Sequence, residues 1–265
     1  MMRFRVGIVT ALGFASFLAL AAAASPGAAP AAGAPAPAEP SYLYKATFVR
    51  AAPGKILELI DLYKSRWPVV EASGDERPLW WRHMEGDQWD LMIITPMGSY
   101  SGYYAKDRVA RRDKSAAASS LSEKEYRAKL EAFTSWQEDV FVMGPPLDSV
   151  KKEFKAAAFY HIEMFVALPG KKADLYRERE MENVYQVGIG RPATMTFVKD
   201  QGAAWDMFSL GCYRDLKHWA GTDDVPKEKK EEAARQAGFS GAGAIGPTMR
   251  TLIDWHRDTI GGAIK

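Results

Sequence analysis

His161 and Glu163 form the pair of residues in this sequence that is best suited to chemistry. One residue separates them, so on a β-strand both side chains lie on one face, roughly 7 Å apart. This arrangement suits a proton acceptor with an orienting carboxylate, or two ligands of a metal ion. A metal site would need a third ligand. His83 is a candidate, but the sequence does not determine on which face of its strand it lies. We predict catalytic roles for His161 and Glu163 and no metal; a histidine bound to a backbone carbonyl is the structural alternative.

Other side chains could line a binding site beside this pair. An arginine at the mouth of a cavity can hold an anionic group, and an aromatic side chain can stack on a ligand. Core packing, or an ion pair between Lys45 and Glu163, explains the same residues without a ligand. The predicted ligand-binding residues are Lys45, Thr47, Arg77, Trp81, His83, Phe165 and Arg191.

Composition and missing motifs exclude several classes of function. The chain has 35 basic and 33 acidic residues, so no large positive excess attracts nucleic acid. Its one cysteine, Cys212, forms neither an internal disulfide nor a thiolate metal cluster. The sequence contains no nucleophile elbow, phosphate-binding loop, dinucleotide fingerprint, zinc-binding helix or c-type haem attachment motif. We expect a small-molecule ligand and no cofactor.

The elements that would position these residues follow a simple order. Alternating aromatic and branched residues predict strands over residues 42–49, 79–84 and 89–95. Between the first two, apolar residues at helical spacing predict a helix that ends or kinks at Pro68. A polar excursion precedes a capping-box pair, Ser122 and Glu125, and then a predicted helix that carries Trp136.

The same series is present twice, which predicts a tandem duplication. The second copy ends in a predicted helix that begins near Pro247 and stops at Gly261-Gly262. A structural residue gains from duplication and a catalytic one does not need it, so repeated Trp-Asp pairs indicate packing and turn roles. The matches are Pro53-Gly54-Lys55 with Pro169-Gly170-Lys171, Arg77-Pro78 with Arg191-Pro192, Trp89-Asp90 with Trp205-Asp206, and Trp136 and Asp139 with Trp255 and Asp258.

Strand, helix, strand, strand, helix is the ferredoxin-like plan. With the strand–Pro-Gly-Lys–helix opening and the duplication, residues 42–260 resemble the dimeric α+β barrel superfamily. That group includes the antibiotic-biosynthesis monooxygenases, the NIPSNAP and EthD-like proteins and the haem-binding chlorite dismutase relatives. The resemblance implies an α+β fold in which two ferredoxin-like modules, residues 41–150 and 151–265, are fused in tandem. Their antiparallel sheets would face each other and form an α+β barrel.

Alternation along the strands then divides the side chains between two faces. We place the apolar sets of the first strands, Tyr44, Ala46 and Phe48 with Tyr160, Ile162 and Met164, against the helices. The other sets, Lys45, Thr47 and Val49 with His161, Glu163 and Phe165, would line the interior between the sheets. The helix over residues 172–183 is highly charged, which indicates a solvated face or, alternatively, a partner-docking face.

The N-terminus has the layout of an export signal. Arg3 and Arg5 precede an apolar run, and Ala22 to Ala24 give a cleavage pattern. We predict a signal peptide over residues 1–24, which we favour over a retained anchor, and a disordered Ala/Pro-rich linker over residues 25–40. The mature protein would be periplasmic or secreted, without stable membrane insertion.

The favoured hypothesis is an exported protein that binds a small, largely apolar molecule between its two sheets. If it is an enzyme, the resemblance implies cofactor-independent, oxygenase-like chemistry, with His161 as the proton acceptor oriented by Glu163. One alternative is a non-catalytic binding or scaffold protein of the cell envelope, for which an oligomer is possible. Another is a haem-binding barrel in which His83 or His161 is the axial ligand.

Overall fold

The computed structural model of the chain describes residues 40–264. The predicted signal peptide lies outside the described residues, as does all of the predicted linker except Pro40, and both stay predictions. Within residues 40–264, no helix has the length and apolar character needed to cross a bilayer.

Two successive sets of elements build the described part of the chain. The first set is β1 (Tyr42–Ala51), α1 (Ile56–Ala72), β2 (Leu79–Glu85), β3 (Leu91–Gly98), α2 (Tyr100–Tyr103), α3 (Lys106–Ala117), α4 (Glu123–Phe133) and β4 (Thr134–Gly144). After α5 (Leu147–Lys155) come β5 (Phe159–Ala167), α6 (Lys172–Gly188), β6 (Thr194–Gln201), β7 (Met207–Tyr213), α7 (Leu216–Ala220), α8 (Lys227–Gln236), the short 3₁₀ turn η1 (Ala242–Ala244), α9 (Ile245–Arg250) and β8 (Ile253–Ala263).

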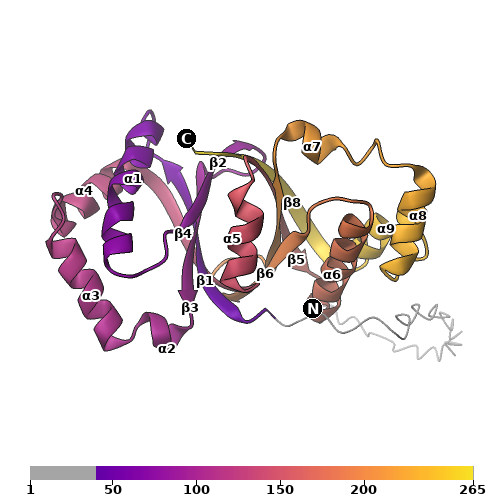
Figure 1. Cartoon of the computed structure of the whole chain (residues 1–265), viewed down its shortest axis with the longest axis horizontal. Helices are drawn as coiled ribbons and strands as arrows, with labels where there is room; N and C mark the ends of the chain where they lie inside the picture. Colours follow the sequence, from indigo (N-terminus) through magenta and orange to yellow (C-terminus); the bar gives the residue numbers. More distant parts are fainter. Residues whose placement is uncertain (1–39, 265) are drawn as a thin grey trace, which may run out of the picture. The chain divides into compact units, whose positions relative to one another are not determined.

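All of these strands join in one closed antiparallel barrel, in the order β1-β3-β2-β8-β5-β7-β6-β4 (Figure 1). The first half contributes β4-β1-β3-β2 and the second half repeats that order as β8-β5-β7-β6. Two seams join the halves, β2 with β8 and β4 with β6. The predicted α+β fold, with two ferredoxin-like halves forming a barrel, is therefore confirmed.

The last element of each half is a strand, so the helices predicted to carry Trp136 and Trp255 are wrong there. Helix α4 ends at Phe133 and β4 begins at Thr134, while α9 stops at Arg250 and β8 contains Trp255. Leu130, Phe133 and Trp136 recur every three residues, which matches a helix, but cross-strand pairing with β1 decides the structure after Phe133.

Gly261 and Gly262, expected to end a helix, instead pair with β2. A Cβ on Gly261 would collide with the Trp81 ring. Glycine is required there because the strand passes directly over an indole.

The interior of the barrel is a packed apolar core. It contains Tyr44, Ala46 and Phe48 from β1 together with Tyr160, Ile162 and Met164 from β5. Rings meet across the two halves: Phe48 lies 6.0 Å from Trp205, and Trp81 stacks on Tyr160 at 5.2 Å. The predicted assignment of faces is therefore wrong, and Lys45, Thr47, His161 and Glu163 lie on the outer face. Alternation told which residues share a face, but not which face turns inward.

Helices cover the outer face: α1 and α4 lie over the first-half strands with α3 packed against α1, and α6 and α9 lie over the second-half strands with α8 packed against α6 (Figure 1). Under α1 the sheet is apolar, and Val49, Leu91 and Ile93 pack against the helix. Under α6 the contact is mixed, because buried Glu178 and Arg179 lie beside the apolar set of Phe165, Leu175 and Met207. The charged stretch of α6 is thus not simply a solvated face.

The repeated Trp-Asp pairs have the structural roles predicted for them. Trp89 and Trp205 are buried in the barrel core. Asp90 accepts a hydrogen bond from the backbone N–H of Ala51 at 2.8 Å, and Asp206 accepts the matching bond from Ala167 at 3.0 Å. Each carboxylate therefore ties the end of the first strand of its half to the third.

Candidate functional site

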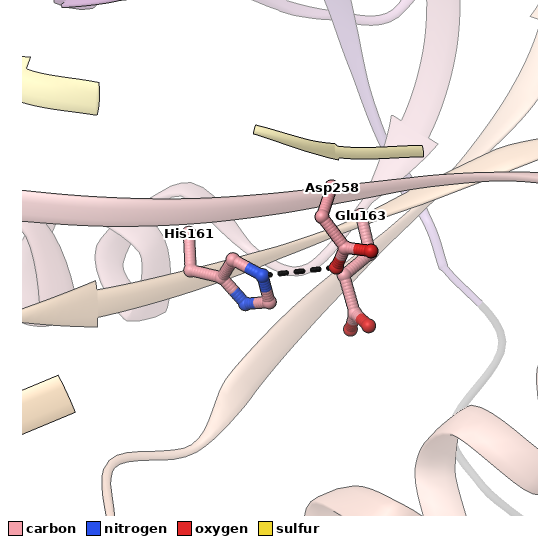
Figure 2. Close-up of side chains that lie close together, drawn as sticks. All are labelled: His161, Glu163 and Asp258. Carbon is pink, nitrogen blue, oxygen red and sulfur yellow. Dashed lines mark hydrogen bonds and ion pairs between the residues drawn. The ribbon is translucent and has the colours of Figure 1, made fainter. Parts of the chain in front are cut away.

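His161 and Glu163 project from β5 on the outer face of the second half, where Asp258 of β8 joins them. Glu163 and Asp258 are directly paired residues of the two strands. The three side chains point toward one another (Figure 2), and one ligating atom from each lies within 4.8 Å of the other two. His83 is not part of this group, because it follows Trp81 on the inward face of β2 and lies against Trp89. The third residue of the cluster is Asp258.

Asp258 is held between two histidines. His161 Nε2 lies 3.1 Å from Asp258 Oδ1, and His256 Nε2 lies 3.3 Å from Asp258 Oδ2. His256 also stacks on Phe165, with ring centroids 6.0 Å apart. Sequence reasoning missed both β8 residues because it placed them in a helix, where residues two apart do not share a face. The signal was present: His256-x-Asp258 repeats the spacing of His161-x-Glu163.

A buried guanidinium from α6 faces the cluster. Arg179 lies 3.6 Å from Glu163, 2.7 Å from Glu178 and 2.5 Å from Glu182. It also lies over the Phe165 ring at 4.9 Å. Three carboxylates thus share this guanidinium, and Asp258 adds a further negative charge beside Glu163. The surroundings of Glu163 are therefore rich in negative charge.

The pKa values of the groups in this site reflect the burial and the excess of carboxylates over positive charge. Burial raises the pKa of Glu163 to about 7, although Arg179 and His161 oppose the rise. Burial likewise raises the pKa of Glu178 to about 7. Burial alone would lower the pKa of His161, but the hydrogen bond to Asp258 and the charge of Glu163 raise it. The pKa of Asp258 is lowered, chiefly by that same hydrogen bond.

The cluster has an aromatic wall and an opening to solvent. The Trp219 ring of α7 lies 5.5 Å from the His161 ring and 5.8 Å from Phe159. Asp258 is half exposed, with 52% of its side chain accessible. It lines a groove of about 460 Å³ together with Gly86, Asp87, Gln88 and Arg257. An ion or small molecule can therefore reach Asp258 from outside.

The first half contains the equivalent positions with different chemistry. Thr47 pairs with Asp139 in the same register as Glu163 with Asp258. Thr47 Oγ1 donates to Asp139 Oδ1 at 2.5 Å, and Lys45 Nζ lies 3.7 Å from the same oxygen. Gln137, at the position of His256, donates to Asp139 Oδ2 at 3.1 Å. The chain itself thus supplies a cation and two donors to Asp139.

The remaining predicted ligand-binding residues are dispersed. Trp81 belongs to the barrel core, and Arg77 lies largely exposed beside Glu71. Arg191 donates to the backbone carbonyls of His218 and Trp219, at 3.1 and 2.6 Å. Arg191 therefore fastens the α7 segment next to the cluster. Phe165 lies beside the cluster, where it stacks on His256 and lies under Arg179.

Comparisons with known proteins agree with this architecture. No family model and no curated protein matches the chain. An anthrone oxidase-like protein of known structure matches with a TM-score of 0.52 and 10% identity, over 85% of this chain and 92% of that one. A candidate monooxygenase from Fusobacterium nucleatum subsp. nucleatum matches with a TM-score of 0.51 and 8% identity, over 85% and 93%. At such identities the likeness concerns the fold, and the chain has the dimeric α+β barrel fold with both halves in a single polypeptide.

Proposed function

We propose that the second half of this protein binds one divalent transition-metal ion through His161, Glu163 and Asp258, and that this ion in turn binds a small molecule. Imidazole and carboxylate together are ligands for ions such as Zn²⁺, Fe²⁺, Co²⁺ and Mn²⁺. The observation that carries the proposal is the convergence of the three ligating atoms within 4.8 Å.

Charge supports the proposal. Glu163, Glu178 and Glu182 share the Arg179 guanidinium, while Asp258 adds another carboxylate. Buried carboxylates without enough positive charge either take up protons or bind a cation. The raised pKa of Glu163 is the proton response of the metal-free protein.

The comparison of the two halves points the same way. The aspartate is kept as Asp139 and Asp258, but its three partners change from Lys45, Thr47 and Gln137 to His161, Glu163 and His256. Each change replaces a residue that rarely ligates metals with one that often does. The built-in cation, Lys45, is replaced by the proposed ligand His161.

Three protein ligands leave coordination positions for water or for a donor atom of a small molecule. Trp219 and Phe159 would contact the apolar part of such a molecule. The predicted small, largely apolar ligand would therefore bind on the outer face of β5 and β8, and not between the two sheets. Export to the periplasm or beyond stays a prediction.

The test is a titration of chelator-treated protein with Co²⁺, followed by visible absorption and calorimetry. We expect one Co²⁺ per chain. His161→Ala and Asp258→Asn should each weaken binding by more than the roughly 10- to 100-fold that loss of an outer-shell partner costs.

Asp139→Asn is the matched control, since it changes the equivalent aspartate of the first half and should bind Co²⁺ like the wild type. Wild-type protein that binds no Co²⁺, or variants of His161 and Asp258 that bind it normally, would refute the proposal.

A metal-free acid–base site is the second candidate function, and the 3.1 Å contact of His161 with Asp258 favours it. Here Asp258, in place of the predicted Glu163, would orient His161, and Glu163 would exchange protons near neutral pH. Activity of this kind would survive complete removal of metal, whereas metal-dependent chemistry would be lost.

A further inference from the structure

The turn between β2 and β3 of the first half packs against the strand that carries Asp258. The turn contains Gly86 and Asp87, and the strand is β8 of the second half. A Cβ on Gly86 would collide with the carbonyl oxygen of Asp258 and with Thr259. Gly86 has φ +113°, a conformation that glycine adopts without strain. The two backbones are therefore in direct contact at Asp258 itself.

Asp87 makes hydrogen bonds with the residues on either side of Asp258 in the sequence, Arg257 and Thr259. Its backbone N–H donates to Thr259 Oγ1 at 3.2 Å. Its carboxylate accepts a hydrogen bond from Arg257 Nη1, also at 3.2 Å. The Asp87 side chain is only 8% exposed, and Thr259 is buried. Asp87 thus fixes β8 on either side of the aspartate.

At the first-half site the equivalent turn is the one between β6 and β7, and it lacks a carboxylate that contacts the neighbouring strand. A Cβ on Gly202, which has φ +92°, would lie 3.0 Å from the carbonyl oxygen of Asp139, a looser approach than that at Gly86. The residue after Gly202 is Ala203, which has no carboxylate, whereas Gly86 is followed by Asp87. The glycine contact is thus common to both halves. The carboxylate is present only where the candidate metal ligands are.

We propose that Asp87, with Gly86 beside it, is a positioning residue that sets the place of Asp258 in the second-half site. This inference rests on the proposed metal site and adds that a turn of the first half completes it. Neither residue belongs to the three ligands. Both act through β8, and Asp87 also lines the groove through which Asp258 meets solvent.

The experiment measures Co²⁺ affinity and the visible spectrum of bound Co²⁺ in the full chain carrying Asp87→Ala, Asp87→Asn or Gly86→Ala. Loss of an outer-shell partner costs about 10- to 100-fold in metal affinity, so Asp87→Ala should weaken Co²⁺ binding about 10-fold. The shape of the Co²⁺ absorption bands should also change, because they report the arrangement of the ligands. Asp87→Asn keeps the side-chain size and an oxygen that can accept the hydrogen bond from Arg257, so its loss should be smaller.

Gly202→Ala is the matched control. It introduces a Cβ at the equivalent contact of the first half, with a comparable backbone conformation, and should leave Co²⁺ affinity and spectrum unchanged. Thermal unfolding of every variant separates a local effect from a general loss of stability.

The outcomes are distinct. If the wild-type protein binds Co²⁺ and all Asp87 and Gly86 variants bind it with the same affinity and spectrum, the positioning role is overturned and the metal site is left intact. An equal loss in Gly202→Ala would overturn it as well, since the effect would then be general. Wild-type protein that binds no Co²⁺ would overturn the proposed function and this inference together.

Discussion

At the scale of single residues, the carboxyl group of Glu163 has a strongly raised pKa. It lies partly buried between Arg179 and the Asp258 carboxylate, and its pKa rises to about 7 from an ordinary value of 4.5. Between these two pH values the folded, metal-free protein holds a proton that the unfolded chain releases. The group therefore contributes stability below pH 4.5 that is lost as the pH rises through 7.

Glu163→Gln should consequently stabilise the metal-free protein at pH 8, by about 1–3 kcal/mol. The gain should shrink toward zero near pH 5, where Glu163 is already protonated when folded. Urea unfolding at several pH values measures this. Glu58→Gln, an exposed change on α1, is the control and should give no such gain; a less stable Glu163→Gln protein at pH 8 would contradict the account.

The sequence identified two of the three cluster residues, because strand alternation alone places His161 and Glu163 on one face. The sequence pattern matches Asp258 with Asp139 of the first copy but does not connect Asp258 with His161 and Glu163. The aspartates are indeed equivalent, but their partners differ. Equivalence of position does not fix a role when the neighbouring residues change.

At the scale of elements, a buried carboxylate attaches α3 to the end of α1. Asp75 lies 2.7 Å from Arg108 Nε and also pairs with Arg112. Both guanidinium groups lie over the Tyr103 ring, at 4.8 and 3.6 Å. Burial alone would raise the pKa of Asp75, but hydrogen bonds from the two arginines lower it. The polar segment 105–120 is largely the helix α3, which lies at the surface and is fixed by this contact.

Asp75→Ala should destabilise the protein by about 2–4 kcal/mol, since it leaves two guanidinium groups without their carboxylate. A depressed pKa makes this contribution present at neutral pH and lost as the pH falls below the ordinary value of 3.8. Chemical unfolding at pH 7 measures the effect, with Asp113→Ala at an exposed position of α3 as control. A change below about 0.5 kcal/mol, the range of ordinary surface substitutions, would contradict this role.

The order of elements was largely predictable, and its failures have one physical cause. The capping box of Ser122 and Glu125 follows from local sequence and is correct. The final strands were not predictable in this way, because β4 and β8 exist through pairing with β1 and β5, which are distant in sequence. Misassigning β8 also hid His256 and Asp258.

At the scale of the whole described chain, the two halves share one core. Phe48 of β1 contacts Trp205 of the second half, and Tyr44 lies 5.3 Å from Phe197. The seams β2–β8 and β4–β6 add backbone hydrogen bonds between the halves. Neither half can lose its interior without exposing that of the other.

Unfolding should therefore occur in a single cooperative transition. Far-ultraviolet circular dichroism and tryptophan fluorescence should give the same midpoint in denaturant. Two separated transitions, one for each half, would contradict a shared core.

The duplication and the barrel were predictable at this scale, but the direction of the faces was not. Both sets of alternating residues in β1 contain apolar side chains, including Val49 and Phe48, so either could have turned inward. The choice depends on contacts between the two halves, which local sequence does not reveal.

The most direct test of the central claim is a crystal structure of the protein soaked in Zn²⁺, with anomalous diffraction recorded at the zinc absorption edge. The account predicts an anomalous peak at about 2.0–2.2 Å from His161 Nε2 and from carboxylate oxygens of Glu163 and Asp258. It predicts none between Lys45 and Asp139. A map without a peak at the second-half cluster, or with an equal peak at the first-half position, would contradict it.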